Sequence, residues 1–225
     1  MNKGKKFEIS LGTERLEAFS DSVFAIVITL LFYNLKTPEL NNHEDWREMF
    51  DALYKFAPRF VGIVLSFMFV AAFWVSHHQF FRTLKQTTRG LLWLNLVFLF
   101  LVCFVPFPAE IMTEHPQNKT AVVFFGATIV LTSVMFSALR YYAWVKHSEI
   151  SGMISEDHIK KALHRSLLLV GLYVLTLLVA FVFPVVAIVL DVLILGILFF
   201  PIKVEVENEE EEDDDDENEK TAVEL

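Results

Sequence analysis

The sequence predicts an all-α, polytopic membrane protein with six transmembrane helices. Of its 225 residues, 54% are hydrophobic and 23 are phenylalanine. These apolar residues come in long blocks with almost no charge, whereas a soluble domain of this size would spread them at helical or strand periods. About 20 apolar residues cross the roughly 30 Å of hydrocarbon in a bilayer, so each long block is one expected span.

Proline residues set several of the expected boundaries. Pro58 suits the first turn of the second span, and Pro106-Phe107-Pro108 ends the third, because proline is tolerated at a helix start and disfavours helix in the residue before it. The stretch 166–202 is too long for one span, and Phe183-Pro184 divides it in two. The expected spans are residues 15–35, 58–81, 90–109, 120–145, 166–183 and 184–202.

Lysine and arginine set the expected orientation, since cytoplasmic loops carry their excess. With six spans, both termini lie on one side of the membrane. The segments on that side and their flanks hold twelve of these residues: Lys3, Lys5, Lys6, Arg15, Arg82, Lys85, Arg89, Arg140, Lys146, Lys160, Lys161 and Arg165. The other side holds five: Lys36, Arg47, Lys55, Arg59 and Lys119. We therefore expect both termini to be cytoplasmic.

The two ends of the chain differ from the apolar middle. Residues 1–14 form a short basic lead, and residues 204–225 form an acidic tail. Glu205 to Glu219 contains twelve acids and no base, which accounts for the net charge of −9. Such a segment has no apolar surface to bury and is expected to be disordered. It is either a solubilising tail or a specific site for a cation or partner.

The first span carries an acid near its start, and an acid inside a membrane helix is a functional-site hypothesis by default. At about 100° per residue, Asp21 points about 140° away from Ile26. It therefore needs a polar partner on another helix. One continuous stripe on the opposite side lies within about 60° of Ile26: Arg15, Phe19, Ser22, Ile26, Thr29, Leu30 and Tyr33.

Candidate partners for Asp21 are Trp74, His77 and His78 at the end of the second span and Asn95 in the third. Trp74 shares a helix face with each of the two histidines. These three residues form either a polar network or an interfacial belt of amphipathic rings. A metal site has less support, because no further ligand stands at a suitable spacing. Asp191, the other intramembrane acid, is expected to be hydrated near the outer interface.

Motifs for enzymatic chemistry are absent from the sequence. It contains no glycine-rich phosphate loop, no nucleophile elbow and no His-Glu-x-x-His, so we expect neither enzymatic activity nor a cofactor. The single cysteine, Cys103, allows no disulfide within the chain. The sequence also lacks the Thr-Val-Gly-Tyr-Gly loop of potassium-channel filters.

Arg15-x-x-x-Phe19-Ser20-Asp21 and the apolar run after it resemble the transmembrane protein 175 family of potassium channels. Trp74-x-x-His77-His78, Asn95 and the Pro106-Phe107-Pro108 ending are also similar to that family. The resemblance implies a six-helix channel domain over residues 15–203, and a homotetramer with four copies of the first helix around the pore. It also implies a single-repeat prokaryotic member in the cell membrane, with the bilayer and further copies of the chain as partners and no nucleic acid.

The resemblance assigns roles to residues of the first span. Ile26 falls on the narrow apolar constriction, Thr29 on a threonine tied to selectivity, and Tyr33 on an outer layer that is usually aliphatic. Ser22 and Leu30 share this pore-lining face. The family's interhelical network falls on Arg15, Phe19, Ser20, Asp21, Trp74, His77 and Asn95.

The expected function is a cation channel that conducts potassium passively with a modest preference over sodium. Apolar rings can gate such a pore by dewetting, and potassium enters only as the permeant ion. Two other functions remain open at this point. One is a proton-coupled transporter that uses Asp21 and His77, and the other is a non-conducting scaffold that recruits a partner through its acidic tail.

Overall fold

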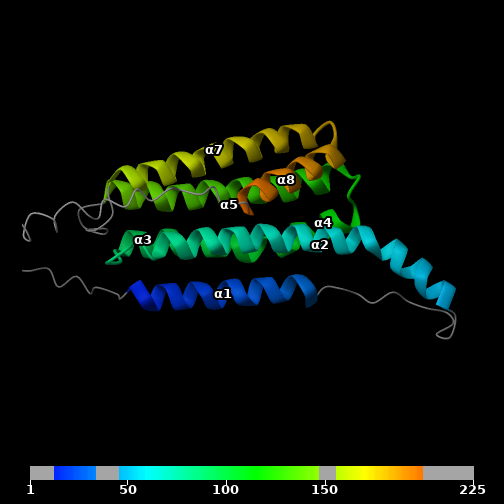
Figure 1. Cartoon of the computed structure of the whole chain (residues 1–225), viewed down its shortest axis with the longest axis horizontal. Coiled ribbons are helices and arrows are strands. Elements are labelled where there is room, and N and C mark those ends of the chain that lie inside the picture. The colour runs from blue at the N-terminus through cyan, green and yellow to red at the C-terminus, as the bar shows by residue number, and fades with distance from the viewer. Residues whose placement is uncertain (1–12, 34–45, 147–155, 200–225) are drawn as a thin grey trace, which may run out of the picture.

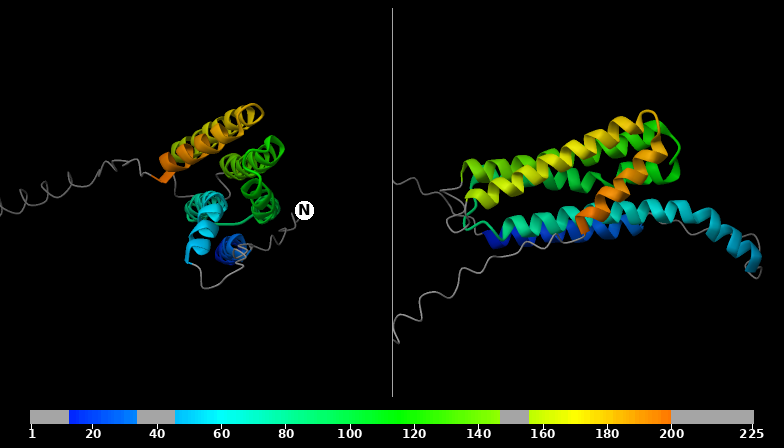
Figure 2. Two further views of the ribbon diagram at one scale, coloured as in Figure 1. Left: turned by 90° about the vertical axis from the view of Figure 1, so that its right-hand side faces the viewer. Right: turned by 45° about the horizontal axis from the view of Figure 1, so that its top comes forward.

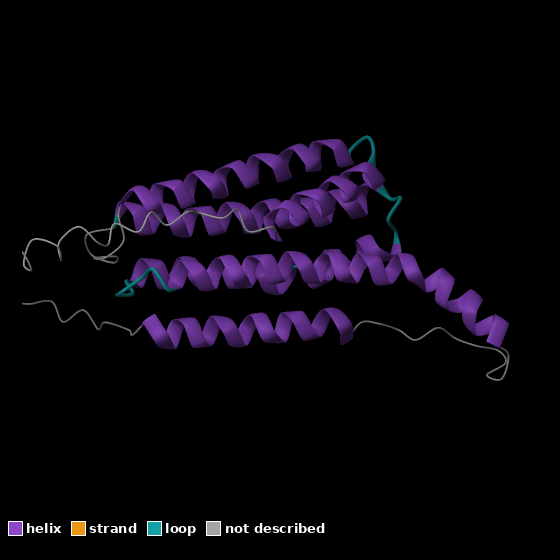
Figure 3. Cartoon of the chain, in the orientation of Figure 1, coloured by secondary structure: helices purple, strands orange, loops and turns teal. Residues whose placement is uncertain are grey.

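The computed structural model describes residues 13–33, 46–146 and 156–199, and its described secondary structure is helical (Figure 3). The helices are α1 (Thr13–Tyr33), α2 (Trp46–Phe81), α3 (Arg89–Phe104), α4 (Pro106–Glu114), α5 (Lys119–Val145), α7 (Glu156–Ala180) and α8 (Pro184–Phe199). The all-α prediction is confirmed. Most of the basic lead and the whole acidic tail lie outside the described residues.

The helices run roughly side by side in a bundle with α1 at one edge (Figure 1). α1 packs against α2 and α3, and α5 joins α3 and α4 to α7. After the turn at the end of α7, α8 returns obliquely and contacts α7, α2 and α5 (Figure 2). This arrangement covers one side of α1 and leaves its other side without a partner among the described residues.

Aromatic side chains fill the space between these helices. Phe24, Phe69, Phe98 and Phe125 are at most 1% exposed, and the ring centroids of Phe69 and Phe125 lie 5.6 Å apart in an edge-to-face arrangement. Aromatic pairs favour this geometry at centroid separations of about 4.5–7 Å. These four buried phenylalanines come one each from α1, α2, α3 and α5. They therefore form part of the core that fixes these four helices relative to one another.

Five helical segments are long and apolar enough to cross a membrane, and one of them combines α3 and α4. The sixth apolar helix, α8, has 16 residues. At 1.5 Å per residue it is about 24 Å long, against roughly 30 Å of hydrocarbon. The expected division at Phe183-Pro184 is confirmed, since α7 ends at Ala180 and α8 begins at Pro184. Six complete spans remain a prediction.

The prediction that α2 begins at Pro58 is wrong. α2 begins at Trp46, so Pro58 lies in the helix interior. A proline there removes one backbone hydrogen bond and bends a helix rather than always ending it. The first part of α2 does turn away from the bundle (Figure 1). The segment apolar enough to cross the membrane begins at Arg59, so the proline marks the start of the expected span but not of the helix.

The third helix ends next to Pro106-Phe107-Pro108, as predicted, but the apolar segment continues beyond these residues to Glu114. α3 ends at Phe104, and α4 starts at Pro106 and continues to Glu114. Val105 keeps helical backbone angles, φ −51° and ψ −43°, so the chain resumes its helix at once. Proline fits there because the first turn needs no N–H donor. Arg59 then pairs with Glu114 at 3.1 Å, which ties α2 to the end of α4.

Close contact between α2 and α4 depends on Gly62. A Cβ at Gly62 would overlap the Thr113 side chain, whereas a Cβ at Gly171 on α7 would meet nothing within 4 Å. We expect Gly62→Ala to lower the thermal unfolding midpoint of the purified protein. Gly171→Ala should leave it unchanged or raise it, because alanine is favoured over glycine in helices by about 1 kcal/mol. Equal midpoints for the two variants would contradict the close approach.

Candidate functional site: the two faces of the first helix

α1 has one face buried in the bundle and one face exposed. Its buried residues follow helical spacing: Leu16, Ser20, Phe24, Val27 and Leu31. The five residues predicted to line a pore are all on the exposed side: Ser22, Ile26, Thr29, Leu30 and Tyr33. Ile26 is 58% exposed and Tyr33 is 84% exposed. This pore-candidate face, defined by those five residues, has no partner within the described part of the chain.

The two hydroxyls beside Ile26 on this face are already engaged as donors. Ser22 Oγ donates to the carbonyl oxygen of Ala18 at 2.8 Å, and Thr29 Oγ1 donates to that of Ile26 at 2.8 Å. Because each hydrogen is used within the helix, the oxygen lone pairs remain available as acceptors. The face can therefore offer oxygen atoms to water or to a hard cation.

The buried face of α1 is joined to α2 and α3 through Asn95. Asn95 Nδ2 donates to Ser20 Oγ at 3.0 Å, and Ser20 Oγ donates to the Leu16 carbonyl at 2.8 Å. On its other side, Asn95 Oδ1 accepts from His77 Nε2 at 2.9 Å. Ser20, His77 and Asn95 are all fully buried. One amide therefore connects three helices in a place that water does not reach.

Aromatic rings hold the His77 imidazole in a single orientation. Its centroid lies 4.2 Å from that of Phe81, with 22° between the ring planes. Phe98 stacks at 5.7 Å with only 6° between the planes. The hydrogen bond to the Asn95 oxygen requires a proton on Nε2, since a carbonyl oxygen only accepts. The packing therefore aims that N–H at Asn95.

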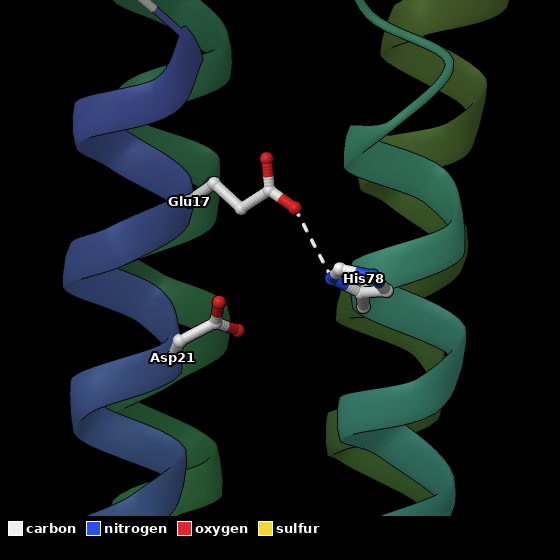
Figure 4. A group of neighbouring side chains, drawn as sticks. All are labelled: Glu17, Asp21 and His78. Atoms are coloured by element: carbon white, nitrogen blue, oxygen red, sulfur yellow. Dashed lines mark ion pairs between the residues drawn. The ribbon is translucent and has the colours of Figure 1, made fainter.

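A second set of polar contacts joins α1 to α2 nearer the start of α1. Trp74 Nε1 donates to Asp21 Oδ1 at 2.9 Å. His78 Nδ1 lies 3.1 Å from Glu17 Oε1, and its ring stacks on Trp74 with centroids 5.8 Å apart. Asp21 thus lies against α2, away from Ile26, as the helical geometry predicts. Figure 4 shows Glu17 and Asp21 on the same side of α1, both directed towards His78.

The grouping of Glu17, Asp21 and His78 is a correction to the sequence analysis. One potential metal-binding atom from each residue lies within 4.8 Å of the others, whereas the sequence analysis identified no third ligand near Asp21. The signal was present, because Glu17 and Asp21 are four residues apart and so share a helix face. Glu17 is therefore a site residue that the sequence analysis missed.

Two predicted network residues do not join this cluster in the structure. Arg15 is exposed and Phe19 is 50% exposed, and both lie on the side of α1 that carries Ile26. Asp191 is also placed differently from the expectation, because it is only 6% exposed on α8 rather than hydrated.

The fold and the first helix define an all-helical integral membrane protein with a buried polar junction behind an exposed stripe. The family model for "Endosomal/lysosomal potassium channel TMEM175" matches residues 15–106, from the start of the first helix to Pro106. A potassium channel of Chryseobacterium sp. (strain P1-3) is 33% identical over 176 residues, covering 77% of this chain and 85% of the relative. The chain belongs to the TMEM175 family of ion channels.

Further comparisons agree with this assignment. The crystal structure of a lysosomal potassium-selective channel TMEM175 homolog from Chamaesiphon minutus matches with a TM-score of 0.72 and 26% identity, covering 83% of this chain and 95% of the other. The human endosomal/lysosomal proton channel TMEM175 is 30% identical over 145 residues, which are 61% of this chain but only 29% of the human protein. The helical arrangement is therefore that of TMEM175-type channels.

The junction at Asn95 predicts a specific loss of stability. In Asn95→Ala, the buried His77 N–H loses its acceptor and the Ser20 oxygen loses a donor. An unsatisfied buried polar group costs about 1–3 kcal/mol. We expect a lower thermal unfolding midpoint, measured on the detergent-purified protein. Gln79→Ala, at an exposed position on α2, is the control and should unfold as the parent does. A midpoint for Asn95→Ala equal to that of Gln79→Ala would exclude a stabilising junction.

Proposed function

We propose that the chain assembles as a homotetrameric cation channel of the cell membrane, with both termini cytoplasmic, and passes potassium in preference to sodium. The observation that carries the proposal is the pore-candidate face of α1, which the described part of the chain leaves exposed. Bacterial relatives named as potassium channels support the choice of ion, as does a structural neighbour titled potassium-selective.

A central pore suits this face better than hydrocarbon does. Ile26 and Leu30 could lie against lipid, but the oxygen atoms of Ser22 and Thr29 would then face a medium with no donors. Both hydroxyls already donate within α1, but only a water-filled pore would also supply donors to their lone pairs. Four copies of α1 around an axis would instead bring these oxygens to water and passing ions.

The order of residues along the face suggests how the pore works. Four Ile26 side chains would form an apolar ring, and Leu30 and Tyr33 would form further rings along the same stripe. Apolar rings of this kind gate by dewetting, without the backbone-carbonyl filter of other potassium channels. Thr29 lies between the Ile26 and Leu30 levels, where its oxygens can replace part of the ion's hydration.

The polar contacts between α1 and the helices behind it act as positioning groups in this scheme. Asn95 holds Ser20, and Trp74 holds Asp21, so the rotation of α1 about its own axis is fixed from behind. Asp21 therefore helps to keep Ile26 on the pore side and does not bind the ion.

The test of the function is ion flux through the purified protein in liposomes, with potassium or sodium as the only permeant cation. Potassium should pass faster than sodium, and no substrate should be needed. Absence of flux with intact tetramers would favour the scaffold, whose activity should then be lost on deletion of residues 205–225. Flux that requires a second solute and moves protons with it would favour a proton-coupled transporter.

Ile26 gives a sharper prediction. Ile26→Asn should raise the potassium leak several-fold, because an amide ring wets the constriction. Leu175→Asn is the matched control, since Leu175 is similarly exposed at 56% but belongs to α7, on the opposite side of the bundle from α1 (Figure 1). An unchanged flux in Ile26→Asn would remove Ile26 from the pore, and an equal rise in both variants would indicate a general loss of integrity.

Asp21 should behave differently from Ile26. Asp21→Ala leaves the Trp74 N–H without its acceptor, so we expect a lower yield of tetramer and a lower unfolding midpoint. The potassium-to-sodium flux ratio of the tetramers that do form should be unchanged. Normal assembly with an altered ratio would place Asp21 in the ion path and contradict its positioning role.

Proton conduction through the same pore is a second candidate function, favoured by the animal relatives, which are named endosomal/lysosomal proton channels. The liposome assay separates the two if a pH-sensitive dye is enclosed. Dissipation of an acid gradient that increases in Ile26→Asn together with potassium flux would indicate a shared path.

A further inference from the structure

A second polar region lies away from α1, in a cavity of about 50 Å³ between α2, α5 and α7. Five polar residues line it, and they come from all three helices: Ser76, Ser133, Arg140, Ser166 and Tyr173. Its other walls are apolar and include Phe69, Phe73 and Leu169. Arg140 and Ser76 lie towards the ends of α5 and α2 that the charge pattern places on the cytoplasmic side.

Arg140 brings a positive charge into this cavity, and none of the described residues that line the cavity is an acid. Its Nη1 donates to the Ala162 carbonyl at 3.0 Å, and its guanidinium carbon lies 4.5 Å above the centre of the Phe136 ring. The ion pairs Arg59–Glu114 and Glu17–His78 do not include Arg140. The charged neighbour that influences it is Arg165, another cation.

Ser133 brings an unused hydroxyl to the same cavity. Its side chain is 6% exposed, and its Oγ has no hydrogen-bond partner in the described part of the chain. Ser166, also in the cavity wall, shows the usual alternative, because its Oγ donates to the Leu163 carbonyl at 2.9 Å. A buried polar group without a partner costs about 1–3 kcal/mol. The Ser133 hydroxyl is therefore a free donor in a place where donors are normally satisfied.

We propose that this cavity binds a phosphate group through the Arg140 guanidinium and the Ser133 hydroxyl. Guanidinium matches the geometry of phosphate oxygens and binds them with two parallel hydrogen bonds. The cavity is large enough for the four oxygens, since about 10–15 Å³ accommodates one water molecule. A water could satisfy Ser133, but it would leave the charge of Arg140 without a counter-charge.

The phosphate can belong to a lipid headgroup or be free in solution. Basic pockets between transmembrane helices on the cytoplasmic side bind anionic headgroups. Here Phe69, Phe73 and Leu169 line the same cavity as Arg140, and a headgroup would enter it with its acyl chains left outside in the bilayer. Free phosphate would use the charged end alone, so the two sources are separated by experiment.

The experiment measures the unfolding midpoint of the full-length protein in detergent, titrated with phosphatidylglycerol, with diacylglycerol or with inorganic phosphate. Phosphatidylglycerol should raise the midpoint, and diacylglycerol, which lacks the phosphate, should not. A rise with inorganic phosphate alone would identify free phosphate as the source. Midpoints that respond to none of the three would overturn the proposal.

Two variants test whether the rise in the unfolding midpoint comes from binding in this cavity. Arg140→Gln should weaken the response about tenfold or more, as expected for the loss of charge-assisted hydrogen bonds. Arg82→Gln is the matched control, because it removes the same charge at an exposed position just after α2 that does not line the cavity. An equal response in Arg140→Gln and the parent protein would overturn the proposal.

Ser133→Ala keeps the test decisive even if Arg140→Gln fails to fold. Without ligand, removal of an unsatisfied hydroxyl should leave the midpoint unchanged or raise it. With phosphatidylglycerol or phosphate, the same variant should show a smaller rise than the parent does. A destabilised protein with an undiminished response would mean that Ser133 serves only the packing of α5.

Discussion

The structure depends on the requirement that polar groups within a bilayer find partners inside the protein. Asn95 meets this requirement for three helices at once, since its amide donates to Ser20 on α1 and accepts from His77 on α2. Phe81 and Phe98 stack on the imidazole and exclude water from it. Breaking any one of these contacts would leave a donor or acceptor in an apolar place, so the three helices are held as one unit.

This junction also explains why α1 can leave half of its surface exposed. A helix at the edge of a bundle is normally held by a wide apolar face. On α1 the buried residues form a narrow row from Leu16 to Leu31, and the hydrogen bonds of Ser20 and Asp21 add directional contacts to it. The residues on the remaining face are therefore not needed to hold α1 against the bundle.

Much of this organisation could be predicted from the sequence, because helical periodicity alone separates Asp21 from Ile26. Predictions from local sequence were less reliable at proline residues, because the residues that follow a proline decide whether the helix continues. Pro58 and Pro106 indicated a helix start and a helix end, yet α2 continues through the first and α4 resumes at the second. Contacts between segments that are distant in the sequence also could not be predicted. No local pattern indicates that Glu17 meets His78, or that Arg140 and Ser133 share a cavity with Tyr173.

The three consecutive residues Ser20, Asp21 and Ser22 show how closely the two faces of α1 are linked. Successive side chains on a helix differ by about 100°, so Ser20 reaches α3, Asp21 reaches α2, and Ser22 lies on the exposed side. A rotation of α1 by one residue would move Asp21 towards the position of Ser22 and replace a hydroxyl with a carboxyl group on the exposed face. It would also withdraw Ser20 from Asn95. The contacts behind the helix and the composition of the face in front of it are therefore set by a single variable, the rotation of α1, and the hydrogen bonds to Asn95 and Trp74 fix its value.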